Sequence, residues 1–252
     1  MPTVTRPDPG TRTLAFAEVE KLMMERLNAW VQDIYHMPFW EAIGRRPDAR
    51  NLLYGWAVEN YHYSAAVRRH IVPALGTGDG SAHPTTRRLL VHLSEEWDHP
   101  QLFLDSARRI AQASGSDEDP ASSRPIAATQ AVVNWLRDAG RSGPLIYKAC
   151  CATLERTATR VEETRVWYHH VAKVMSLPTA AVAPFIAHAE TDEVYEHQNA
   201  LGEFRADVAA VAKTEVDLAL TRAREFISLY RVWQAGIMAH YRHFPAGRGA
   251  LL

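Results

Sequence analysis

The stretch His92-Leu-Ser-Glu-Glu-Trp-Asp-His99 contains three side chains of the types that bind transition metals. His92, Glu96 and His99 stand at positions i, i+4 and i+7, so they share one face if the stretch is helical. Two imidazoles and a carboxylate on one face provide only part of a metal site, because such a site in a helical protein takes ligands from several helices. The stretch therefore predicts a helix bundle in which other helices carry the remaining ligands.

Helical periodicity continues in both directions from this stretch, and no segment shows a convincing strand alternation. The pattern predicts an all-α, single-domain bundle of seven helices over residues 13–242, with a flexible tail at residues 1–12 and a second tail at residues 243–252. The predicted helices span residues 13–35, 49–75, 85–114, 127–138, 144–175, 179–201 and 203–241. Loops are expected at residues 36–38 and 44–47, and Pro100 either kinks the third helix or divides it.

Composition narrows the class of protein. The chain has 252 residues, 47% of them hydrophobic, and a net charge of −1, which gives no electrostatic signal for nucleic acid or an anionic membrane. No apolar run approaches the ~18 residues of a membrane span. The two cysteines, Cys150 and Cys151, are neighbours, which favours a reducing, cytoplasmic setting. We expect a small-molecule substrate and no nucleic-acid or membrane partner.

Two further predicted helices carry metal-binding side chains. Glu155 lies on the fifth, and His188 and Asp192 lie one turn apart on the sixth, with Tyr195 on the same face. His197 falls almost opposite His188, so it could join them only through a helix irregularity such as a π-bulge. Taken alone, each residue is more often part of a solvated or hydrogen-bonded polar face. Together they match the needs of a carboxylate-bridged two-metal site in a bundle.

Five short passages resemble the haem-oxygenase-like di-iron oxidases and oxygenases, which share a seven-helix fold with thiaminase II and pyrroloquinoline-quinone synthase. His36-Met-Pro-Phe-Trp40 and Gly55-Trp-Ala-Val-Glu-Asn-Tyr-His-Tyr63 resemble the wider superfamily. Three passages resemble the metal-dependent branch, in the order in which they occur along the chain: Glu95-Glu96-Trp-Asp-His99, Leu154-Glu155 and Phe185-Ile-Ala-His188-Ala-Glu-Thr-Asp192.

The resemblance implies an iron-dependent oxidoreductase with two Fe(II) ions per chain and O2 as co-substrate. It would oxidise or cleave a small amino acid, amine or fatty acid in secondary metabolism. The implied metal ligands are Glu96, His99, Glu155, His188, Asp192 and His197, of which Glu96, His99 and Glu155 are also assigned to catalysis. His92 becomes a supporting neighbour. The chain departs from the family where the last histidine is expected, because Tyr195 stands there.

The candidate substrate-binding residues are Glu59, His62 and Tyr63 on the second predicted helix, with Tyr195, although ordinary helix packing explains the first three equally well. Two alternatives remain open. One is a cofactor-independent enzyme of the quinone-synthase or thiaminase type that uses His62, Tyr63, His99 and Tyr195. The other is a metal-free helical binding protein. The long last helix could also pack against a second copy in a homodimer.

Overall fold

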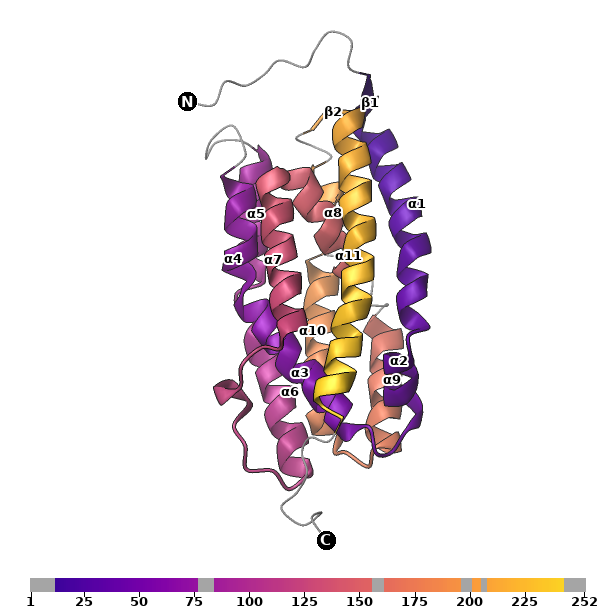
Figure 1. The fold of residues 1–252 in the computed structure, drawn as a ribbon, viewed down its shortest axis with the longest axis vertical. Helices are drawn as coiled ribbons and strands as arrows, with labels where there is room; N and C mark the ends of the chain where they lie inside the picture. Colours follow the sequence, from indigo (N-terminus) through magenta and orange to yellow (C-terminus); the bar gives the residue numbers. More distant parts are fainter. Residues whose placement is uncertain (1–11, 77–83, 156–160, 196–200, 205–207, 243–252) are drawn as a thin grey trace.

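The computed structural model describes residues 12–76, 84–155, 161–195, 201–204 and 208–242, and these are almost entirely helical (Figure 1). The all-α class is therefore confirmed. The α-helices are α1 (Phe16–Tyr35), α2 (Pro38–Arg45), α3 (Arg50–Ala65), α4 (Val67–Leu75), α5 (Pro84–Glu95), α6 (His99–Ala113), α7 (Ala127–Ser142), α8 (Pro144–Glu155), α9 (Val161–Val174), α10 (Ala183–Val194) and α11 (Lys213–His240).

The structure divides several predicted helices. The second ends at Ala65 and restarts at Val67, and nothing in the local sequence signals this break. The third divides into α5 and α6, with Pro100 in the first turn of α6, where a missing N–H costs no hydrogen bond. Between and partly over the loops expected at residues 36–38 and 44–47 lies α2, which begins at Pro38 for the same reason. The expectation of seven continuous helices was wrong in these places.

The prediction of no strand was also wrong. Strand β1 (Thr13–Ala15) pairs antiparallel with β2 (Ala210–Ala212), Leu14 lying opposite Val211. Each strand has three residues, which is too short for an alternating pattern to stand out. This small pairing lies at one end of the bundle and joins the start of α1 to the start of α11 (Figure 1).

Helix α11 runs along most of the bundle and packs on α1, α7 and α8 (Figure 1). On the other side, α6 contacts α3 and α10, and α10 also contacts α9. The interior between them is rich in aromatic side chains, and those of Trp233, Tyr147 and Tyr230 are fully buried. None of the described helices is long and apolar enough to cross a membrane.

Candidate metal centre and cavity

Six metal-binding side chains form two groups in the interior of the bundle. One group contains His99, His188 and Asp192, and the other contains His92, Glu96 and Glu155. Within each group, one ligand atom from every residue lies within 4.8 Å of the others. The residues come from α5 and the turn after it, and from α6, α8 and α10, so segments far apart in the sequence converge here.

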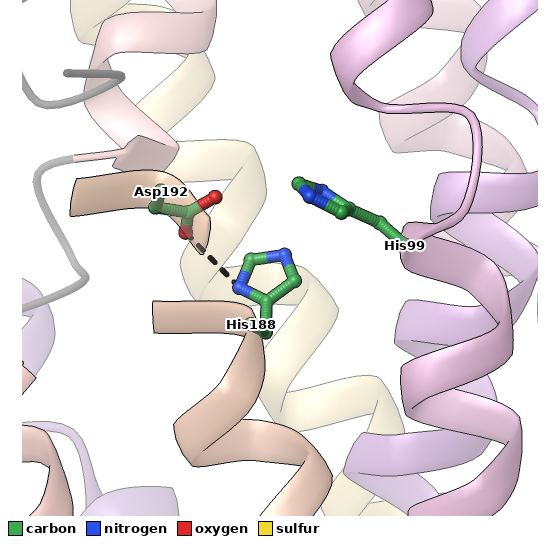
Figure 2. A group of neighbouring side chains, drawn as sticks. All are labelled: His99, His188 and Asp192. Atoms are coloured by element: carbon green, nitrogen blue, oxygen red, sulfur yellow. Dashed lines mark ion pairs between the residues drawn. The ribbon is translucent and has the colours of Figure 1, made fainter. Parts of the chain in front are cut away.

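The two groups adjoin each other through Glu96 and His99. His99 Nδ1 lies 2.8 Å from Glu96 Oε2, which connects a member of one group to a member of the other. In the group of His99, His188 and Asp192, His188 Nδ1 lies 3.0 Å from Asp192 Oδ2, and the rings of His99 and His188 are 4.5 Å apart (Figure 2). His99 and Asp192 are each 2% exposed and His92 is 3% exposed, so most of this centre is shielded from bulk water.

The break between α5 and α6 explains why one stretch serves both groups. A continuous helix would hold His92, Glu96 and His99 on one face. Helix α5 instead ends at Glu95, and α6 begins at His99 after a turn. The break leaves His92 and Glu96 beside Glu155. His99 instead lies near His188 and Asp192 of α10 (Figure 2).

Charge accumulates at the centre. Burial by itself lowers the pKa of His188, but Asp192, which accepts its hydrogen bond, and the nearby Glu96 and Glu155 outweigh burial and raise that pKa. Three carboxylates close together in a dry interior are costly unless cations compensate them. The protein therefore stabilises positive charge at this place.

The donor set fits two transition-metal ions. It contains three imidazoles and three carboxylates, the mixture that iron, manganese and zinc accept. Ligand atoms bound to one ion at roughly 2.0–2.2 Å lie at most about 4.4 Å apart, so each group needs only small adjustments to close on an ion.

Five of the six predicted ligands lie in these groups, namely Glu96, His99, Glu155, His188 and Asp192. The sixth, His197, is outside the described residues. His92, which the resemblance left as a supporting neighbour, stands in a group as an equal member. Its position one turn before Glu96 was the signal that could have identified it.

A cavity of about 790 Å³ adjoins the centre, and five of the six grouped residues, all except His99, line it. Aromatic side chains form a large part of its wall: Tyr35, Trp40, Trp56, Tyr63, Phe103, Tyr147, Trp167, Tyr168, Phe185, Tyr230 and Trp233. Asn60, Ser64, His70 and Cys151 add polar atoms. The space suits a small molecule with an apolar or aromatic body.

The four predicted substrate-binding residues lie in different environments. Tyr63 lines the cavity. Glu59 is fully buried outside its wall and accepts hydrogen bonds from Thr129 and Tyr241. His62, also outside the wall, lies 2.8 Å from the Ser123 hydroxyl. Tyr195 is 44% exposed at the end of α10, likewise outside the wall.

Solved structures share this architecture across nearly the whole chain. A domain of unknown function with a haem-oxygenase-like fold from Shewanella denitrificans is 18% identical with a TM-score of 0.65, over 94% of this chain and 97% of that one. A TenA homologue from Pseudomonas syringae is 14% identical with a TM-score of 0.55, over 89% and 93%. A CADD-like protein of unknown function from Nostoc punctiforme is 16% identical with a TM-score of 0.52, over 90% and 96%.

These similarities establish the class: the chain has the haem-oxygenase-like fold, as the sequence passages predicted. At such low identity they show the fold alone. No family model matches the chain, and no curated protein does. The function must therefore be argued from the site.

Proposed function

We propose that the protein is a non-haem di-iron oxidase or oxygenase that uses O2 to oxidise or cleave a small substrate. One observation carries the proposal: two adjoining groups of three nitrogen and oxygen ligands lie beside a cavity rich in aromatic side chains. The resemblance of Glu95–His99, Leu154-Glu155 and Phe185–Asp192 to the di-iron oxidases supports the same chemistry.

The two groups would each hold one ion. His92, Glu96 and Glu155 would bind the first, and His99, His188 and Asp192 the second. Glu96 also contacts His99, so its carboxylate connects the two sets of residues that would hold the ions. Three protein ligands per ion leave coordination positions open on each, and a bound Fe(II) pair supplies the electrons for O2 reduction.

The remaining residues shape the space around those open positions. Phe103 and Phe185 lie against the second group, Phe103 with its ring 4.7 Å from that of His188. Tyr63, also in the cavity wall, packs near Trp233, with their rings 5.8 Å apart. These rings exclude water and offer stacking surfaces to an apolar or aromatic part of the substrate.

Metal content after anaerobic Fe(II) loading tests the proposal directly. The wild-type protein should bind about two Fe(II) per chain and consume O2 when air is admitted. Asp192→Asn should lose about one of them, because the second group loses its only carboxylate. The matched control is Glu193→Gln, which changes the next residue on α10, an exposed one, and should bind iron like wild type.

Thermal unfolding with added Mn(II) gives a second measurement. An ion that binds only the native state raises the unfolding midpoint, and Asp192→Asn should show a smaller rise than Glu193→Gln. Absence of iron binding in the wild-type protein, or equal binding by both variants, would contradict a di-iron site. Turnover of a substrate that survives a strong chelator would favour a cofactor-independent enzyme instead.

A further inference from the structure

His70, on α4, is a buried histidine in the cavity wall outside both ligand groups. It is 2% exposed and stacks on Tyr63, with the two rings 5.5 Å apart and inclined by 12°. Its Nδ1 lies 2.8 Å from the Tyr147 hydroxyl. Its Nε2 has no hydrogen-bond partner among the residues that the structure describes. A buried nitrogen in this state is costly, and a ligand in the cavity could relieve the cost.

The hydrogen bonds of Tyr147 indicate which atom carries the histidine proton. Tyr147 forms a second hydrogen bond with Cys151, one turn further along α8, and this bond raises the pKa of Tyr147 and lowers that of Cys151, as expected when the tyrosine O–H points to the sulfur. With that O–H engaged, the tyrosine oxygen is available to accept a hydrogen bond from His70 Nδ1–H. A neutral imidazole with its proton on Nδ1 carries a lone pair on Nε2. Burial lowers the pKa of His70 to about 4, so the ring is neutral near pH 7.

We propose that His70 Nε2 accepts a hydrogen bond from an N–H or O–H group of the substrate, which is therefore an amine, amide or hydroxyl compound with an apolar or aromatic body. This inference deepens the proposed function, because the same cavity holds both His70 and the candidate metal ligands. The negative charge of Glu96 acts on both His70 and Tyr147, so the donor group would lie near the His92–Glu96–Glu155 group.

The test compares two probes of nearly equal shape, 2-naphthol and 2-methoxynaphthalene, of which only the first can donate. Binding is measured by quenching of tryptophan fluorescence, since Trp40, Trp56, Trp167 and Trp233 line the cavity. Wild-type protein should bind the naphthol about three- to tenfold more tightly than the ether, the range for one neutral hydrogen bond. In His70→Phe the two dissociation constants should become equal.

His169→Phe is the matched control. It removes an exposed histidine that lies outside the cavity wall, so the naphthol preference should remain. A second measurement needs no variant: ring 15N shifts of wild-type His70 should show the proton on Nδ1, with the Nε2 signal moving when naphthol is added.

Three results would overturn the inference. One is equal binding of the two probes by the wild-type protein, and another is a preference that persists in His70→Phe. The third is a proton found on Nε2, which would make this nitrogen a donor. All measurements are made on the full chain as purified and again after dialysis against EDTA. The probe-binding result therefore does not depend on whether the protein binds iron, and a negative result with the probes does not affect the iron measurement.

Discussion

Glu59 allows a direct test between two roles, because the sequence suggested that it binds substrate, whereas the structure gives it a stabilising role outside the cavity. The carboxylate is fully buried between α3, α7 and the end of α11. Its Oε1 accepts from the Tyr241 hydroxyl at 2.6 Å, and its Oε2 accepts from Ile126 N at 3.2 Å and from the Thr129 hydroxyl. Thr129 in turn accepts from Trp233 Nε1 at 2.8 Å. The carboxylate therefore holds three segments together from outside the cavity.

Glu59→Gln keeps the shape and removes the charge. Hydrogen bonds to a charged acceptor are worth about 1 kcal/mol more than neutral ones, so three of them lose about 3 kcal/mol. The lower desolvation cost of an amide offsets part of this, which leaves a destabilisation of about 2 kcal/mol. In a chain of this length, that lowers the unfolding midpoint by about 4–8 °C.

Thermal unfolding and naphthol binding, measured on the same samples, separate the two roles. Glu59→Gln should unfold earlier and bind 2-naphthol like the wild type below its midpoint. Glu118→Gln, at an exposed position, should change the stability by no more than about 0.5 kcal/mol. The reasoning is refuted if Glu59→Gln is as stable as the control but has lost probe binding, since Glu59 would then contact the ligand.

Two further perturbations follow from the packing around His70. A Cβ at Gly140 would lie 2.9 Å from the His70 carbonyl oxygen and 3.1 Å from Ala74 N, both backbone atoms, so Gly140→Ala should cost about 1–2 kcal/mol in urea unfolding. Gly76→Ala, whose nearest atom is at 3.6 Å, should stay within about 0.5 kcal/mol, and equal stability of the two variants would exclude the close helix contact. Burial lowers the pKa of His70 from 6.5 to about 4. Below pH 6.5, His70 binds a proton in the unfolded chain but not in the native state. The free energy of unfolding therefore has its full value above pH 6.5 and decreases as the pH falls toward 4. Between pH 6.5 and 5 the wild type should lose about 2 kcal/mol more than His70→Phe, and parallel profiles would refute the assignment.

Regular spacing made much of the candidate site predictable. His188 and Asp192 stand one turn apart within α10, so helix geometry fixes that pair whatever the rest of the chain does. Glu96 lies in the turn before α6, where its three-residue separation from His99 still allows the two side chains to meet. The all-α class followed from helical periodicity in the same way. The pairing of Thr13–Ala15 with Ala210–Ala212 could not be predicted, because it joins segments almost 200 residues apart that are too short to show a pattern.

The substrate-binding residues were harder for a different reason. In α3 every residue from Leu52 to Asn60 is buried, so periodicity carries no information about which side faces the cavity. Glu59 turns toward α7 and α11, whereas Tyr63, one turn later, reaches the cavity. Only the packing of neighbouring helices distinguishes them, and a single sequence does not display that packing.

The break between α5 and α6 is relevant to Tyr195, which stands at the end of α10 where the resemblance places the family's last histidine. With Tyr195 at that position, a site built like that of the family would lack one imidazole. The break between α5 and α6 leaves His92 beside Glu96 and Glu155, so the His92–Glu96–Glu155 group has three members without any ligand after Asp192. On the proposed function, His92 therefore takes over the role that the family gives to the last histidine. The two ions would then need no ligand from the end of α10, where Tyr195 is exposed at 44%.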